Sequence, residues 1–170
     1  MQNDTRSLDA EAVKMTPIHY KDETALQALV SQEFGNWSHR IKVDQNMIDQ
    51  YAELSGDHMW LHVDIERCAK ESPFGSTIAH GFLILSLLPK MNGGGSKLGD
   101  IAGFSHIMNY GSDKLRFLTP VPVDSEIHLR NRIKGIDVSE KKTKIVLENQ
   151  IYTVGSDTPA LVYELMFVYL

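Results

Sequence analysis

The chain has 170 residues, a length that suits one domain with a sizeable hydrophobic core. Hydrophobic residues make up 42% and charged residues 23%, as in globular proteins, and the formal net charge is -5. The acidic balance and the lack of a long basic run argue against nucleic-acid binding, and no apolar stretch is long enough to span a bilayer.

The sequence predicts an N-terminal extension over residues 1–30 and a single domain over residues 31–170. Residues 1 to about 20 are polar and aperiodic, which is typical of a mobile tail. Residues 23–30 have short helical character. Apolar and polar residues then alternate over residues 37–43, and this period of two predicts a strand.

A helix is expected directly after this strand. Asp44 fits its N-cap, because an aspartate side chain accepts hydrogen bonds from the free N–H groups of the first turn. Gly56 falls where a left-handed residue would end the helix. The segment from Asp57 to His62 is expected to be a loop, and Asp64 is expected to cap a second short helix.

Residues 78–88 are apolar on almost every side, which predicts a buried helix. Pro89 is expected to kink or weaken its end, because proline lacks the N–H of a helical hydrogen bond. The glycine run of residues 92–96 predicts a flexible exit.

The rest of the chain reads as strands separated by turn residues, over residues 104–110, 114–118, 126–133, 143–154 and 160–170. The last of these is almost wholly apolar and suits a central strand. One buried helix followed by several strands predicts an α+β architecture, with a sheet wrapped over the helix.

Asp57 and His62 are the first candidates for chemistry. An aspartate after a helix-ending glycine is often only a turn residue, and a lone histidine is often only a satisfied polar group. A carboxylate held beside an imidazole, however, can carry out general acid–base catalysis near neutral pH. His58 and Asp64 lie close enough in sequence to suggest a metal site, but no familiar zinc spacing is present, so no metal is expected.

The motif Gly56-Asp57-x-x-x-x-His62, followed by Ile78-Ala79-His80-Gly81, resembles the (R)-specific enoyl-CoA hydratase family, the MaoC-like dehydratases. The stretch from Asp57 to Asp64, with Asn109-Tyr110-Gly111, is similar to the branch of nodulation protein N-like hydratases. The resemblance runs from about Phe34 to Leu170. It implies a hot-dog fold, in which an antiparallel sheet wraps around a long central helix, and it implies a homodimer.

The resemblance also implies roles for individual residues. Asp57 and His62 would hold and activate water, and the Gly81 N–H would donate to the thioester oxygen as negative charge develops there. The candidate substrate-binding residues are Met59, Trp60, His80 and Tyr110. His80 and Tyr110 have packing as the alternative reading. Many family members carry asparagine and proline where this chain has Met59 and Trp60, and a methionine side chain cannot donate a hydrogen bond.

The expected activity is therefore reversible hydration of trans-2-enoyl thioesters to (3R)-hydroxyacyl thioesters, with no cofactor. The expected partner is an acyl-CoA or an acyl-carrier thioester. A hot-dog thioesterase is one alternative, although residues 78–88 lack the carboxylate that several of those enzymes carry on the central helix. A non-catalytic acyl-thioester binding subunit is another, favoured by Met59 alone. The single cysteine, Cys68, allows no intrachain disulfide, and no secretory signal is evident, so a cytoplasmic location is expected.

Overall fold

The computed structural model describes residues 16–91 and 97–170. The predicted tail, up to residue 15, and the predicted flexible exit at residues 92–96 lie outside the described residues. No helix in the described part is both long enough and apolar enough to cross a membrane.

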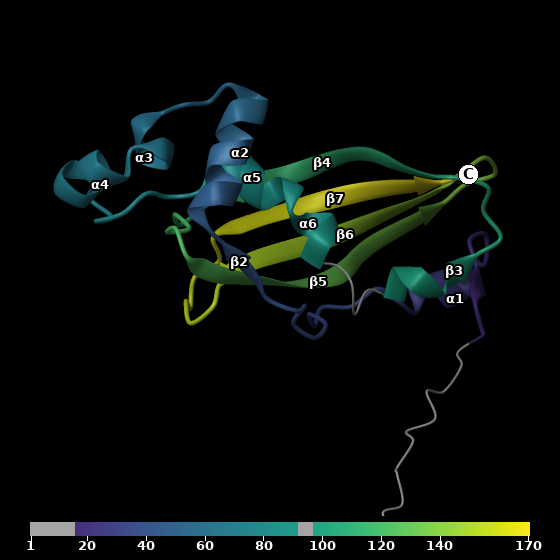
Figure 1. Cartoon of the computed structure of the whole chain (residues 1–170). Coiled ribbons are helices and arrows are strands. Elements are labelled where there is room, and N and C mark those ends of the chain that lie inside the picture. Colours follow the sequence, from purple (N-terminus) through teal and green to yellow (C-terminus); the bar gives the residue numbers. More distant parts are fainter. Residues whose placement is uncertain (1–15, 92–96) are drawn as a thin grey trace, which may run out of the picture.

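A five-stranded antiparallel sheet forms the main layer, in the order β2-β5-β6-β7-β4. The helices α2 (Gln45–Ser55), α5 (Gly81–Ser86) and α6 (Leu88–Met91) lie across one face of this sheet (Figure 1). The apolar C-terminal stretch forms β7 inside the sheet, so the prediction of a central strand is confirmed. Together, sheet and helices give the predicted α+β, hot-dog architecture. The strands are β2 (Ile41–Val43), β4 (Ile107–Phe117), β5 (Ser125–Val138), β6 (Thr143–Thr153) and β7 (Leu161–Tyr169).

The strand β4 is continuous where the sequence predicted two strands separated by Gly111. Its pairing with β7 shifts register twice, between Asn109 and Gly111 and between Asp113 and Arg116. Lys114, in the second irregularity, has a positive φ of 52°. Such bulges absorb extra residues and bend a strand without ending it, which explains why the glycine does not break β4.

The predicted caps of the first helices are confirmed. In α2 (Gln45–Ser55) the Asp44 side chain accepts from Met47 N at 2.9 Å, and Gly56 ends the helix in the left-handed region with φ 76°. Asp64 accepts from Arg67 N at 2.9 Å and begins α4 (Ile65–Glu71). The predicted loop before Asp64 is only partly a loop, because residues 60–63 form the single-turn helix α3 (Trp60–Val63).

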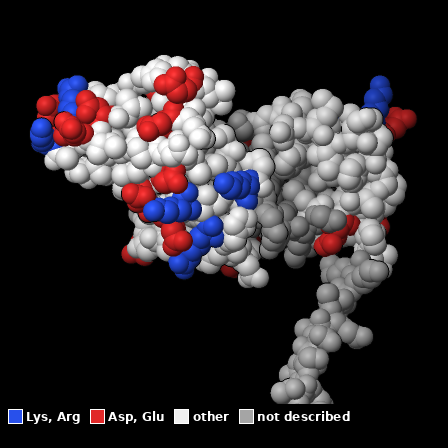
Figure 2. Space-filling model, in the orientation of Figure 1, with Lys and Arg blue, Asp and Glu red and all other residues white. Residues whose placement is uncertain are grey.

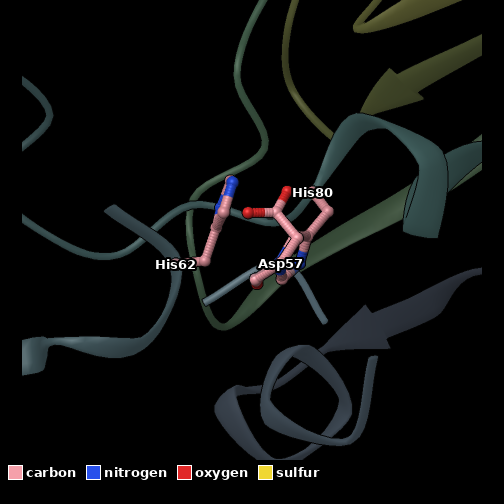
Figure 3. A group of neighbouring side chains, drawn as sticks. All are labelled: Asp57, His62 and His80. Atoms are coloured by element: carbon pink, nitrogen blue, oxygen red, sulfur yellow. The ribbon is translucent and has the colours of Figure 1, made fainter. Parts of the chain in front are cut away.

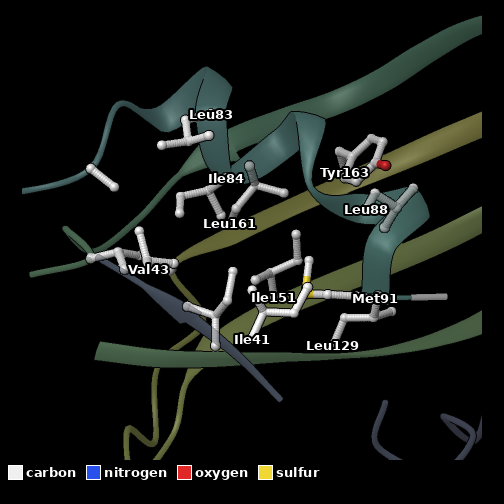
Figure 4. Packing of buried hydrophobic residues seen from close by; sticks show 14 of the residues in the cluster. Ile41, Val43, Leu83, Ile84, Leu88, Met91, Leu129, Ile151, Leu161 and Tyr163 are labelled. Atoms are coloured by element: carbon white, nitrogen blue, oxygen red, sulfur yellow. The ribbon is translucent and has the colours of Figure 1, made fainter. Parts of the chain in front are cut away.

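The buried helix is shorter than predicted. It starts at Gly81 and divides into α5 (Gly81–Ser86) and α6 (Leu88–Met91), with Leu87 between them. Pro89 lies in α6 and lacks an N–H for the carbonyl four residues earlier, which accounts for the break. Leu83, Ile84, Leu88 and Met91 point into the core against Leu129, Ile151 and Leu161 of the sheet (Figure 4). Phe82, by contrast, is 59% exposed, so this helix has one open flank.

A second apolar cluster covers the other end of the sheet. It joins Leu26 and Leu29 to Ile133, Ile145 and Tyr169. Residues 16–30 therefore pack on the domain, with Leu26 fully buried, while the predicted boundary at residue 31 stays a prediction. The small elements here are β1 (Ile18–His19), α1 (Glu23–Gln27), the 3₁₀ helix η1 (Lys97–Asp100) and β3 (Ile101–Ala102).

Basic and acidic side chains alternate on the face of the molecule shown in Figure 2 instead of forming separate fields. At the β2–β5 edge, Arg40 pairs with Glu126 at 3.3 Å and Lys42 with Asp124 at 2.8 Å. These exposed basic groups are thus already matched by carboxylates.

Candidate active site

Asp57 lies on the exposed loop between α2 and α3. The left-handed turn at Gly56 directs the chain out of α2, and the Asp57 N–H then donates to Ser55 Oγ at 3.3 Å. The Asp57 carboxylate accepts a hydrogen bond from the main-chain N–H of Met59, also at 3.3 Å. The backbone of the loop therefore orients this side chain.

His62 is half-buried on α3, and its ring has a defined tautomer. Its Nδ1 lies 2.8 Å from the carbonyl oxygen of Ile78. Because a carbonyl oxygen can only accept, Nδ1 carries the proton, and the neutral ring keeps a lone pair on Nε2. The tautomer is thus the one in which Nε2 can take a proton from water.

Two polar side chains from other elements support this arrangement, and no sequence motif points to either of them. Gln45, in the first turn of α2, donates through Nε2 to the main-chain oxygen of His62 at 2.8 Å. The hydroxyl of Thr77 donates to the side-chain oxygen of the same glutamine. Gln45 therefore links α3 to the segment that leads into α5.

His80 is the N-cap residue of α5 and is only 3% exposed. Its side chain does not cap the helix but donates through Nε2 to the Asp57 carbonyl oxygen at 2.9 Å. The ring stacks on His62 with centroids 3.8 Å apart, and it contacts the Tyr51 ring at 5.0 Å. Burial lowers the pKa of His80 below its ordinary value, and neighbouring His62 adds to this.

Asp57, His62 and His80 form one cluster, in which one ligand-type atom of each lies within 4.8 Å of the others (Figure 3). That spacing lets one water contact both the carboxylate and an imidazole at ordinary hydrogen-bond length. The donor set could in principle hold a metal ion. However, stacked rings direct their nitrogen lone pairs side by side and not toward one point, so the geometry does not fit two imidazole ligands on a common ion.

A cavity of about 460 Å³ opens beside His62 and the start of α5. Its wall is mostly apolar and includes Gly81, Phe82 and Phe117. Gly81 is the first residue of α5, and no residue of the described chain accepts a hydrogen bond from its N–H. The cavity thus has an imidazole and a free backbone donor on an otherwise apolar wall.

Phe117 is a lining residue that sequence reasoning missed. A β-carbon added to Gly81 would lie 2.7 and 2.8 Å from two carbons of the Phe117 ring. The ring also meets Phe82 edge-on, with centroids 5.4 Å apart. A side chain at position 81 would therefore force the Phe117 ring at the end of β4 to move, through a contact between segments far apart in the sequence.

The remaining candidates lie elsewhere. Tyr110 lines a second cavity of about 690 Å³ between α5, α6 and strands β4 and β7, together with Ser86 and Tyr163. Met59 is 50% exposed, and Trp60 packs its ring under the Arg67 guanidinium at 4.2 Å. Neither residue lines either of these two cavities.

Comparison with protein families matches residues 25–154 to the MaoC-like domain. A curated relative, 3-hydroxyacyl-thioester dehydratase Z of Mycobacterium tuberculosis, is 35% identical over 140 residues, which cover 82% of this chain and 89% of the relative. Nodulation protein N of Rhizobium leguminosarum bv. viciae is 48% identical over 101 residues, covering 59% of this chain and 61% of that protein.

Solved structures agree with the fold. An (R)-hydratase from A. caviae involved in PHA biosynthesis superposes with a TM-score of 0.62 at 25% identity, over 81% of this chain and 96% of that one. A monoamine oxidase regulatory protein from Archaeoglobus superposes with a TM-score of 0.67 at 23% identity, over 79% and 87% of the two chains. The second likeness concerns the fold alone.

Proposed function

The chain belongs to the MaoC-like dehydratase family, and on that premise we propose that it adds water reversibly to trans-2-enoyl thioesters to give (3R)-hydroxyacyl thioesters. One observation carries the proposal: ligand-type atoms of Asp57 and His62 lie within 4.8 Å of each other, and His62 lines a cavity that Gly81 also lines. The relatives act in the same class of chemistry, as their names state.

The Asp57/His62 pair holds the water in this proposal. One of the two groups takes a proton from the water as its oxygen attacks C3, and a proton is delivered to C2. His62 Nε2 is suited to accept a proton because Nδ1 already donates to Ile78 O.

Gly81 stabilises the negative charge in this proposal. As the bond to C3 forms, electrons move toward the thioester oxygen, and a fixed N–H donor there lowers the barrier. Such a donor contributes about 3 kcal/mol in acyl-transfer enzymes. Gly81 N–H has no other acceptor in the described chain, and the apolar wall around it reduces screening by water.

The second cavity suits the acyl chain, with Tyr110 on its wall as the substrate contact. It lies toward the C-terminal end of α5 and α6, whereas the first lies at the start of α5, and it is lined mainly by apolar residues such as Leu85, Leu88 and Phe167. The thioester would be carried by CoA or an acyl-carrier protein. His80, Met59 and Trp60 stay candidate substrate contacts, and the lone cysteine fits a reducing, cytoplasmic location.

We also propose a homodimer. The strand β4 is the edge of the sheet over eleven residues, and four of its apolar side chains are exposed. A long apolar edge strand is a template for pairing with another chain. The exposed residues are Ile107, Met108, Tyr110 and Phe117.

The test measures crotonyl-CoA hydration by loss of enoyl absorbance. Asp57→Asn keeps an oxygen to accept from Met59 N–H but removes the charge, and His62→Ala removes the imidazole. Each is expected to lower kcat at least about 100-fold with little change in melting temperature. Asp64→Asn is the matched control, because asparagine is as good an N-cap for α4 and Asp64 lies outside the cluster. Near-normal turnover by a well-folded Asp57 or His62 variant would exclude the acid–base assignment.

The same assay separates the alternatives. A thioesterase would release free thiol from crotonyl-CoA, and a binding subunit would change neither signal. Neither α5 nor α6 carries a carboxylate that could serve as a thioesterase base or nucleophile, which favours the hydratase.

A further inference from the structure

We infer that His80 is a positioning residue for the Asp57/His62 pair, a neutral hydrogen-bond donor that fixes both members at once; the inference rests on the proposed hydratase function. Its ring reaches neither cavity wall described above. It reaches Asp57 through the main-chain oxygen and His62 through the face of the ring.

Histidine is an unusual residue at the N-cap of α5. An N-cap position favours serine, threonine, aspartate or asparagine, whose side chains accept from the first-turn N–H groups. His80 makes no such cap and instead donates away from the helix. The side chain at this position therefore bonds the loop that carries Asp57 and does not cap the helix. Residues that depart from the local preference for their position are often functional.

The surroundings of His80 determine its protonation state. The Asp57 carbonyl oxygen only accepts, so Nε2 of His80 must carry the proton. Nδ1 is buried and has no hydrogen-bond partner in the described chain. A second proton at Nδ1 would be a buried donor without an acceptor, which costs the full desolvation of that group. His80 is thus restricted to one neutral tautomer.

A neutral His80 ring allows His62 to take up a proton without charge repulsion. The titratable groups around His80 are Asp57, His58, His62 and Tyr51. When His62 accepts a proton from water, its positive charge develops 3.8 Å from the centre of the His80 ring. A charged His80 would oppose that transfer, whereas a neutral one supports the ring without repulsion.

A fourth observation joins the two sides of the site. The Ile78 carbonyl sets the tautomer of His62, and His80, two residues later, supports the ring face and binds the Asp57 loop. The short segment from Ile78 to His80 therefore fixes the distance between carboxylate and imidazole. Displacing a catalytic group by about 1 Å can cost about 100-fold in rate, so losing this support should reduce kcat more than binding.

The test uses the full chain and three variants. His80→Phe keeps a ring to stack on His62 but removes the Nε2 donor. His80→Gln restores an N–H near the same position without a titratable ring. His128→Phe is the control, because His128 is another partly buried histidine, stacked on Trp37 at 3.9 Å, and its pKa is also lowered by burial.

His80→Phe is expected to lower kcat for crotonyl-CoA by about 10- to 100-fold with KM changed less than about threefold. His80→Gln keeps a donor but lacks the ring stacked on His62, so it should recover only part of the lost kcat, and His128→Phe should change neither constant. Normal kcat in His80→Phe would overturn the inference.

A second readout requires no substrate, so it separates failure of this inference from failure of the proposed function. Imidazole ¹⁵N–¹H spectra of the unmodified chain should show His80 as the Nε2–H tautomer throughout about pH 5.5 to 8, the range in which an ordinary histidine titrates. In His80→Gln, which lacks the ring stacked on His62, the Nδ1–H form of His62 should become less populated. Protonation of His80 within that range, or an unchanged His62 tautomer in the variant, would refute the positioning role.

Discussion

Replacing Gly81 by alanine tests the placement of the oxyanion donor, and the structure determines what the added methyl meets. It would lie 2.7 and 2.8 Å from two ring carbons of Phe117 and 3.2 Å from a third. Carbon atoms pack best at about 3.5–4.0 Å, so the ring must retreat by roughly 0.8 Å or rotate. The methyl therefore acts on the cavity wall first and on the thioester through it.

The stability cost should be small. Overpacking a rigid core costs about 1–3 kcal/mol, but Phe117 is 46% exposed and can swing outward, which favours the low end. Alanine also offsets up to about 1 kcal/mol through its better helix propensity, and less at this first helical position. The net change should stay within about 1 kcal/mol, which corresponds to roughly 2–4 °C in Tm for a chain of this size.

Activity should fall much further, with kcat/KM for crotonyl-CoA at least about tenfold lower, because the donor N–H and the ring beside it are both displaced. The double variant Gly81→Ala/Phe117→Leu separates two causes. Recovery of kcat/KM would assign the loss to the Phe117 clash, and no recovery would assign it to obstruction of the thioester itself. A Gly81→Ala enzyme with both normal Tm and normal kcat/KM would refute the placement of the site.

Two further predictions concern the sheet. If β4 pairs with a second copy, light scattering at micromolar concentration should give twice the mass of one 19.2 kDa chain. Met108→Glu on the exposed edge strand should shift the mass toward that of one chain. A monomeric unmodified protein would contradict the proposal. The hydrogen bond from Lys134 lowers the pKa of Glu164, so this carboxylate stabilises the fold above its ordinary pKa and loses that contribution as pH falls through the lower folded value. Melting curves from pH 7 downward should therefore show a smaller acid-induced loss of Tm in Glu164→Gln than in the unmodified chain, and parallel curves would show that Glu164 contributes nothing.

Local chemistry made part of the fold predictable from the sequence. Asp44, Gly56 and Asp64 act within a few residues of themselves, and each occupies the cap position that its side chain or backbone freedom indicates. The alternation in β5 and β6 and the apolar character of β7 also reflect local rules, since one face or both faces of a strand are buried.

Other features depend on contacts between distant segments and were missed for that reason. The continuity of β4 through Gly111 requires β7 beside it, because only a partner strand can hold a bulge in place. The contact of Phe117 with Gly81 joins residues 36 positions apart, and Gln45 reaches His62 across 17. No periodicity in the sequence records such pairs, so the candidate site could be located by its motif while its supporting residues could not.

The effect of Met59 on the site follows from the family pattern and the contacts in the structure taken together. Many family members carry an asparagine here, so the methionine puts the substrate range, and to a lesser degree the activity, in question. In the structure the main-chain N–H of Met59 donates to the Asp57 carboxylate, and His80 binds the Asp57 carbonyl oxygen. Both contacts on Asp57 are independent of the side chain at position 59, which is half exposed. The carboxylate can therefore keep its place beside His62 with methionine at this position. The departure from the family pattern should affect the range of substrates that contact this loop more than the acid–base pair.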